Sequence, residues 1–132
     1  MSVRPKPVVD HDTKPFWDAV AQHRLVLRYC EDCGRYLYYP RAVCPHCFSE
    51  RLSWREASGR GTIYTYTVSH RAVAPYWEGK TPYVVALIDL EEGPRMLSNV
   101  LAPPEAVRIG QKVRVVFTTV DDWTYPEFVP DE

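Results

Sequence analysis

The stretch at residues 29–50, YCEDCGRYLYYPRAVCPHCFSE, holds all four cysteines of a chain of 132 residues. They form two Cys-x-x-Cys pairs separated by ten residues, at Cys30, Cys33, Cys44 and Cys47. Two such turns that face each other on a ribbon present four thiolates as a tetrahedron, with zinc–sulfur distances of roughly 2.3 Å. A site closed by four thiolates has no open position for a substrate. We therefore predict one structural zinc ion.

The residues beside the second cysteine of each pair bear on the kind of metal. Gly34 follows the first pair and suits the left-handed backbone that a tight metal-binding turn often needs, whereas Phe48 stands at the corresponding place after the second pair. A rubredoxin-like electron carrier uses the same spacing for iron, but it would favour the glycine turn twice. With four cysteines available, we interpret His46 as a solvent-facing turn residue.

Composition and charge limit the classes of protein. A chain of this length that is 45% hydrophobic can bury one core with a small appendage. The net charge of -1 gives no overall basic field for nucleic acid or an anionic membrane. The opening MSVRPKPVVDHD lacks the apolar stretch of a signal peptide, and no run of about eighteen apolar residues could span a bilayer. We expect a cytoplasmic protein with reduced cysteines and no membrane contact.

The fold expected from these patterns is mainly β, in three segments. Residues 1–23 form an N-terminal arm and a short helix, which Asp12 or Thr13 can cap and which ends at about His23. Its expected apolar face consists of Phe16, Trp17, Val20 and Ala21.

Residues 24–58 are predicted to form the zinc ribbon. Its strands are expected from Leu25 to Tyr29, at 36–39 and at 52–57, and Pro40 keeps the second strand short.

Residues 59–132 are predicted to form a five-stranded barrel. Runs rich in β-branched and aromatic residues lie at 61–72, 83–90, 95–102 and 112–120. The segment 102–110 is long enough for one helical turn between the third and fourth runs, as in an OB fold. An SH3-like barrel is the alternative.

Catalytic patterns are sparse. Ser69 and His70 are neighbours in a predicted strand, so their side chains point to opposite faces and cannot act as nucleophile and base. The acidic pairs at 91–92 and 121–122 lie near predicted turns, where solvated carboxylates are common. We predict a protein that is not an enzyme on its own.

Nucleic-acid binding remains an alternative function. Six arginines lie between Arg24 and Arg55, with aromatic residues interleaved as stacking platforms need. The rest of the chain cancels this local charge, and the tyrosines of 36–39 can equally pack on the barrel.

The order of several motifs resembles a known family. TKPFWDAVAQHRLVLRYC, the four-cysteine ribbon, SGRGTIYTYTVSHRA, PYVVALIDLEEG, IGQKVRVVF and the closing PEFVP follow one another as in the acyl-CoA-associated family that joins a rubredoxin-like zinc ribbon to a C-terminal OB fold. This similarity covers nearly the whole chain after the first dozen residues.

The resemblance implies a noncatalytic accessory subunit. Members bind a thiolase, a lipid-transfer-protein-like aldolase of the thiolase fold or a hydratase, and help it handle acyl-CoA. Some members are fused behind a hot-dog-fold hydratase in steroid side-chain degradation. The resemblance therefore also allows that this chain is the C-terminal part of such a fusion protein. We expect it to stabilise a thiolase-fold enzyme and to help form its acyl-CoA channel.

One loop is the candidate for contacts with the partner or with acyl-CoA. Residues 72–83, AVAPYWEGKTPY, join the first two predicted barrel strands and carry Tyr76 and Trp77. Arg71 and Lys80 flank these aromatics and could meet a CoA phosphate. The alternative is that Trp77 folds back and caps the barrel.

Overall fold

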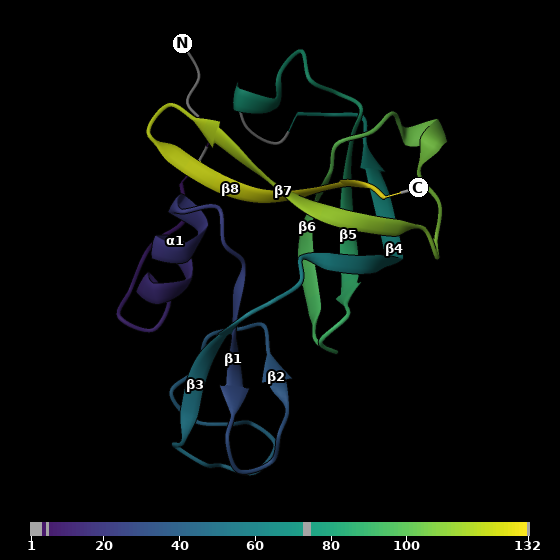
Figure 1. Cartoon of the computed structure of the whole chain (residues 1–132). Helices are drawn as coiled ribbons and strands as arrows, with labels where there is room; N and C mark the ends of the chain where they lie inside the picture. Colours follow the sequence, from purple (N-terminus) through teal and green to yellow (C-terminus); the bar gives the residue numbers. More distant parts are fainter. Residues whose placement is uncertain (1–3, 5, 73–74, 132) are drawn as a thin grey trace.

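The structure is a computed structural model that describes residues 4, 6–72 and 75–131. It consists of one short helix, a three-stranded ribbon and a closed five-stranded barrel (Figure 1). The predicted mainly β fold is confirmed. Among the described residues, no helix is long and apolar enough to cross a membrane.

The helix α1 spans Lys14–Ala21, with Thr13 at its N-cap position. The Thr13 side chain does not cap the helix, because its Oγ1 accepts the backbone N–H of Asp10 at 3.0 Å. The Thr13 N–H in turn donates to Asp10 Oδ1 at 2.9 Å. The helix stops before His23, whose positive φ of 60° takes the chain out of the helical conformation.

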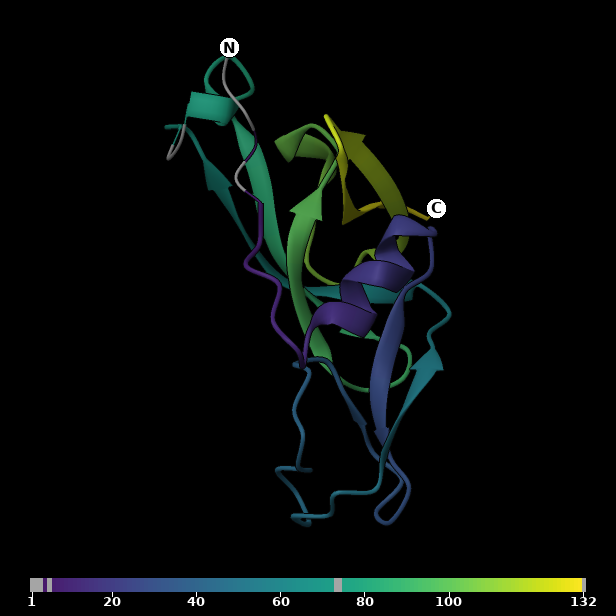
Figure 2. The ribbon, with the colours of Figure 1, turned by 90° about the vertical axis from the view of Figure 1, so that its left-hand side faces the viewer.

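The buried face of α1 differs from the expected face, because Ala19 takes the place of Ala21 and Trp17 is only partly buried. Phe16, Ala19 and Val20 are buried, whereas Ala21 is exposed. Trp17 lies at the edge of this face, with its ring 5.8 Å from that of Trp123 on the last barrel strand. The helix thereby packs between the barrel and the base of the ribbon (Figure 2).

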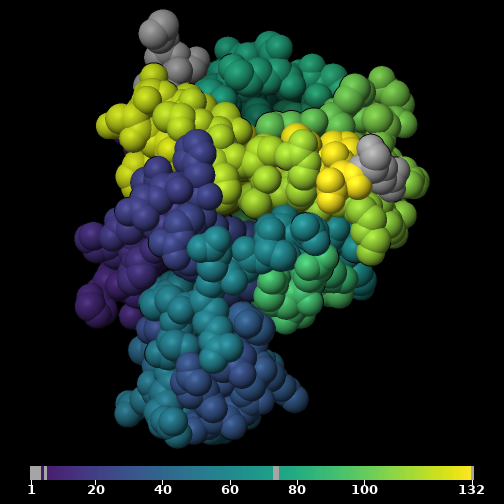
Figure 3. Space-filling model, in the orientation of Figure 1, coloured from purple at the N-terminus to yellow at the C-terminus, as the bar shows by residue number. Residues whose placement is uncertain are grey.

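The ribbon has β1 (Val26–Cys30) in its centre, with β2 (Tyr36–Leu37) and β3 (Leu52–Glu56) antiparallel on either side. The strand β2 is two residues shorter than the predicted 36–39. Tyr38 leaves the ladder and packs edge-on against Phe16, with ring centroids 6.2 Å apart. The ribbon forms a lobe that projects from the barrel (Figure 3).

The barrel consists of β4 (Arg60–Ser69), β5 (Tyr83–Leu90), β6 (Arg95–Val100), β7 (Lys112–Val120) and β8 (Trp123–Pro130). These strands close in the order β4-β5-β6-β8-β7. A short 3-10 helix, η2 (Pro104–Ala106), lies between the third and fourth strands. This is the OB plan rather than the SH3-like alternative.

Among the described residues, β6 and β8 have the fewest paired residues of any neighbouring strands in the barrel, and we call this contact the seam. The two strands register at one position among the described residues, Val100 opposite Phe128. The Leu101 N–H extends the seam by donating to the Phe128 carbonyl at 2.8 Å. The Ser98 hydroxyl adds a bond to the Pro126 carbonyl at 2.9 Å.

One hydrophobic core runs through all three parts. Alternate residues of β5, from Val84 to Leu90, point into the barrel and are buried. The same cluster includes the buried face of α1 and, at the base of the ribbon, Leu25, Leu27 and Ala57. The base of the ribbon is therefore fixed to the barrel by packing, whereas its cysteine-bearing end lies outside this core.

Candidate functional site

The four cysteines come together at the end of the ribbon that is remote from the barrel. Their sulfur atoms all lie within 4.8 Å of one another. The Sγ atoms of Cys30 and Cys47 are 3.5 Å apart, and those of Cys33 and Cys44 are 3.7 Å apart. A tetrahedral zinc site with bonds of about 2.3 Å has sulfur–sulfur edges of about 3.8 Å. The cysteines, which are free of disulfides, are therefore positioned to bind a metal ion.

The two metal-binding turns have the same backbone shape in spite of their different residues. Gly34 has φ of 74° and donates its N–H to the Cys30 carbonyl at 2.9 Å. Phe48 has φ of 64° and donates its N–H to the Cys44 carbonyl at 2.8 Å. The expected left-handed glycine is confirmed, and Phe48 adopts this conformation as well. Its side chain is 79% exposed.

Backbone N–H groups point at two of the sulfur atoms. The N–H of Cys33 donates to Cys30 Sγ at 3.4 Å, and the N–H of His46 donates to Cys44 Sγ at the same distance. The Cys33 N–H stabilises the thiolate of Cys30 and lowers the pKa of that thiol to about 7. Burial, by contrast, raises the pKa of the Cys33 thiol. The fit of this site to a cation that takes thiolate ligands therefore rests on the positions of the four sulfur atoms.

His46 lies outside the cysteine cluster, as predicted. Its imidazole is exposed, and Nδ1 lies 2.9 Å from Nη1 of Arg35. The guanidinium is the donor in this contact, so Nδ1 is occupied as an acceptor.

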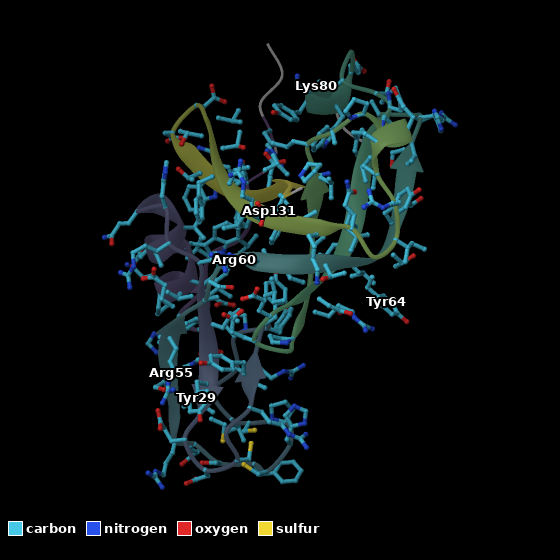
Figure 4. All side chains as sticks on the ribbon, turned by 45° about the vertical axis from the view of Figure 1, so that its right-hand side comes forward. Tyr29, Arg55, Arg60, Tyr64, Lys80 and Asp131 are labelled. Carbon is cyan, nitrogen blue, oxygen red and sulfur yellow. The ribbon has the colours of Figure 1, made fainter. Side chains whose placement is uncertain are left out.

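The candidate contact loop lies at the opposite end of the molecule from the metal-binding end. In Figure 4 the sulfur atoms gather at the foot of the ribbon, while Lys80, which belongs to the loop, lies at the top of the barrel. A metal ion held by the cysteines would therefore not contact this loop. It could affect the loop only through the residues that lie between them.

Trp77 is partly folded back onto the barrel. It belongs to the short 3-10 helix η1 (Pro75–Trp77), and its ring stacks on Tyr83 of β5 with centroids 4.3 Å apart. Tyr76 meets Trp77 edge-on at 5.0 Å. Lys80 donates to the Tyr76 carbonyl at 3.0 Å, with Nζ 4.3 Å from the centre of the Tyr76 ring.

Three of the four candidate contact residues line one cavity of about 290 Å³ at the mouth of the barrel. These are Tyr76, Trp77 and Lys80, whereas Arg71 lies exposed just after β4 and does not line this cavity. Their role as partner or acyl-CoA contacts stays a prediction.

Two charged residues that line this cavity, Arg4 and Glu127, were not among the sequence candidates. Arg4 reaches into it from the N-terminal arm, and its Nη2 lies 2.9 Å from Oε2 of Glu127 on β8. The aperiodic arm offers no signal for such a contact. Glu127 was the available indication of this contact in the sequence, because it is an acidic residue between the apolar Tyr125 and Phe128 of the closing strand.

Three of the six arginines of the ribbon region, Arg24, Arg51 and Arg55, pair with carboxylates of the chain. Arg24 pairs with Glu56 at 2.8 Å, and Arg51 pairs with Asp32 at 2.6 Å. Arg55 lies over the ring of Tyr29, with Cζ 3.7 Å from its centre (Figure 4). This pairing lowers the charge that the ribbon presents to a nucleic-acid backbone.

Two family models match this chain. The rubredoxin-like zinc ribbon domain of ChsH2 matches residues 17–53, and the C-terminal OB-fold domain of ChsH2 matches residues 54–118. Together they cover most of the helix, the ribbon and most of the barrel.

Relatives with similar sequences occur in several settings. The 3-oxo-4,17-pregnadiene-20-carboxyl-CoA hydratase alpha subunit of Mycobacterium tuberculosis is 36% identical over 96% of this chain, which spans 40% of that subunit. A DUF35 domain-containing scaffold protein of Methanocaldococcus jannaschii is 39% identical over 70% of this chain and 67% of its own length. The benzoylsuccinyl-CoA thiolase subunit BbsA of Thauera aromatica is 29% identical over 70% of this chain and 62% of its own length.

A solved structure matches the arrangement of the whole chain. A chain of the Ltp2-ChsH2(DUF35) aldolase superposes with a TM-score of 0.87 and 35% identity, covering 96% of this chain and 100% of that one.

Proposed function

The chain belongs to the ChsH2 family, which joins a rubredoxin-like zinc ribbon to a C-terminal OB fold, and from this membership we propose that it is a noncatalytic accessory subunit. In this proposal it binds and stabilises a thiolase-fold enzyme that acts on acyl-CoA, such as a thiolase or a lipid-transfer-protein-like aldolase. A hot-dog-fold hydratase is a further partner in the same assembly.

The observation that carries this proposal is the superposition on the aldolase subunit. A TM-score of 0.87 over 96% of the chain means that ribbon, helix and barrel keep the same mutual arrangement in both proteins. A subunit that docks on its partner through both lobes would need such a shared arrangement. Relatives named as a thiolase subunit and as a hydratase alpha subunit support the acyl-CoA setting.

The metal in this proposal is one zinc ion with a structural role. The four sulfur atoms match a zinc tetrahedron, and each cysteine is needed as a ligand. Bound zinc would hold the two turns of the ribbon together and supply no reactive position. Free thiols of this kind suit a reducing compartment, and we place the protein in the cytoplasm.

The loop at the mouth of the barrel is proposed as the contact with the partner and its acyl-CoA channel. Tyr76 and Trp77 offer aromatic area of the kind that anchors protein interfaces. Lys80 and the exposed Arg71 add cations for a CoA phosphate. The hydratase of M. tuberculosis makes steroid side-chain degradation the proposed pathway setting.

Co-purification from the native cell tests this proposal. A tagged copy of the chain is recovered under mild conditions, and the bound protein is identified by mass spectrometry. We expect a thiolase-fold enzyme in a fixed ratio, lost when the metal site is disrupted by Cys30→Ser. Recovery of the chain with no acyl-CoA enzyme, or with nucleic acid that is released by salt, would contradict it.

A further inference from the structure

The guanidinium of Arg4 sits in a cage of three aromatic side chains at the mouth of the barrel. Its Cζ lies 4.0 Å from the ring centre of Tyr125, 5.2 Å from that of Trp77 and 5.5 Å from that of Tyr76. A cation within about 6 Å of an aromatic ring face is attracted by the ring quadrupole. We call Tyr76, Trp77 and Tyr125 the aromatic cage.

The floor of the aromatic cage is a buried carboxylate. The side chain of Glu127 is 3% exposed, and its Oε2 accepts from Arg4 Nη2 at 2.9 Å. A charge buried without a partner is costly, and removing one member of a buried ion pair is strongly destabilising. The buried carboxylate of Glu127 therefore needs a cation in the aromatic cage to balance its charge.

The geometry of the site favours a guanidinium over an ammonium. Arg4 Nη2 alone makes both polar contacts, to Glu127 and, at 3.4 Å, to Oδ1 of Asn99 on β6, while the guanidinium lies over the rings. The planar guanidinium of arginine stacks on aromatic faces, whereas the compact ammonium of lysine has no such plane.

The arm that carries Arg4 has few other described anchors on the barrel. Lys6 pairs with Asp122 at 2.5 Å, but both side chains are exposed, and exposed ion pairs contribute little to stability. The Tyr125 hydroxyl donates to the Arg4 carbonyl at 3.4 Å. Val8, further along the arm, is 90% exposed. Much of the attachment of the arm therefore resides in the Arg4 side chain.

The space beside the guanidinium is open enough to admit a second side chain. The cavity of about 290 Å³ runs from Arg4 and Glu127 along the loop that carries Tyr76 and Lys80. An incoming arginine could reach the aromatic cage from this cavity as Arg4 leaves it.

We propose that the aromatic cage with Glu127 is a binding site for an arginine side chain presented by another protein chain, and that Arg4 is its internal occupant. The arm and the incoming arginine then compete for one carboxylate. The occupant is an arginine of the partner enzyme, and in this respect the inference rests on the proposed function. The chemistry of the site itself does not depend on which enzyme that is.

A small blocked amino acid tests the site without any partner enzyme. The full chain and its Arg4→Ala variant are titrated with N-acetyl-arginine amide, and binding is measured by calorimetry and by the shift in melting temperature. We expect Arg4→Ala to bind this probe at least tenfold more tightly than the wild type, because the arm no longer fills the cage. N-acetyl-lysine amide should bind the variant at least tenfold more weakly than the arginine probe.

Two further variants keep the test decisive. Arg4→Ala combined with Glu127→Gln should lose the probe, and Arg24→Ala, which breaks the exposed pair with Glu56, should bind it no better than the wild type. If Arg4→Ala does not fold, Arg4→Gln keeps a hydrogen-bonding side chain and takes its place. Equal affinities of wild type and variant, or equal affinities for the two probes, would overturn the inference. Because no enzyme is present, such a failure is separate from a failure of the proposed function.

Discussion

At the scale of single residues, the ribbon depends on four sulfur atoms and two left-handed turns. The sulfur atoms lie within 4.8 Å of one another at the end of the ribbon, outside the hydrophobic core. Apolar burial therefore contributes little there, and metal binding has to supply the folding free energy of this end.

The change Cys30→Ser tests this dependence. It leaves three thiolates and an incomplete tetrahedron, so the ribbon end should lose its metal and its order while much of the barrel survives. Zinc content by atomic absorption, together with thermal unfolding followed at two wavelengths, measures both effects. One equivalent of zinc and unchanged partner binding in the variant would show that the cysteines do not serve as a structural metal site.

The two left-handed positions predict opposite effects of exchanging their residues. Gly34→Ala should destabilise the ribbon by about 1 kcal/mol, because a side chain costs roughly that much at positive φ. A Cβ at Gly34 would approach the Tyr29 hydroxyl at an ordinary 3.5 Å, so the cost is conformational. Phe48→Gly should relieve the same strain and stabilise the ribbon by about 0.5–1 kcal/mol. The chelator concentration that removes half of the zinc ranks the wild type and the two variants by the stability of the ribbon. A lower concentration for Phe48→Gly than for the wild type would mean that the exposed Phe48 ring makes stabilising contacts.

Much of the candidate site could be predicted from local patterns, and the rest depends on distant contacts. The cysteine spacing, Gly34 and the secondary role of His46 follow from the geometry of a short turn. Arg4 and Glu127 are 123 residues apart, and nothing in the aperiodic arm shows that its arginine returns to the closing strand. Ala21 was assigned to the buried face of the helix although Ala19 occupies it, because helical spacing alone does not fix the docking angle.

At the scale of the elements, the strands rich in β-branched residues were predicted best. The bounds of β5 and β7 match the runs 83–90 and 112–120, although only β5 has every second residue buried. The strand β8 contains Pro126 and Pro130, which usually mark a strand end, and only the resemblance indicated its last five residues. Barrel closure outweighs this local signal, because β8 fills the gap between β6 and β7.

The first barrel strand contains a glycine that its neighbours make necessary. A Cβ at Gly61 would lie 2.6 Å from Ile88 Cγ2 and 2.8 Å from the carbonyl oxygen of Asp89. We expect Gly61→Ala to destabilise the barrel by about 2 kcal/mol or more, because the backbone of β5 cannot move aside cheaply. Thr67→Ala, at an exposed position of the same strand, is the matched control and should cost less than about 1 kcal/mol. Urea denaturation compares the two, and equal midpoints would contradict the close approach.

The loop between β4 and β5 predicts a loss of partner binding on truncation. Trp77→Ala should weaken binding to the thiolase-fold partner at least tenfold, or about 1.4 kcal/mol. The stack of Trp77 on Tyr83 adds a stability cost, which we expect to be the smaller of the two effects. Trp77→Phe keeps a ring on Tyr83 and separates the contributions. A large fall in melting temperature with unchanged affinity would assign Trp77 to the barrel alone.

At the scale of the whole molecule, ribbon, helix and barrel act as one body. Their shared core includes Phe16 of α1, Leu27 of β1 and Ile63 of β4. Such a body can hold two distant surfaces at a fixed separation, with the metal-binding end and the barrel mouth at opposite ends (Figure 4). This rigidity suits an accessory subunit.

The accessory role predicts no chemistry from the isolated chain. The purified protein should show no turnover of acyl-CoA substrates, whereas its addition to the cognate thiolase-fold enzyme should raise activity or soluble yield. Steady-state assays of each component alone and of the mixture measure this. Robust turnover by the chain alone would overturn the proposal, and a catalytic centre would have to be sought.

The thin seam between β6 and β8 has a consequence for motion. Closure there depends on the register pair Val100–Phe128 and on a few flanking bonds, among them the bridge that Arg4 makes from Asn99 to Glu127. Opening this wall breaks fewer backbone bonds than separating β4 from β5, so the amide hydrogen of Leu101 should exchange with deuterium earlier than those in the middle of β5. Departure of the arm would accelerate that exchange. Occupancy of the barrel mouth could then be measured as the exchange rate of Leu101, which lines the same cavity as Arg4 and Glu127.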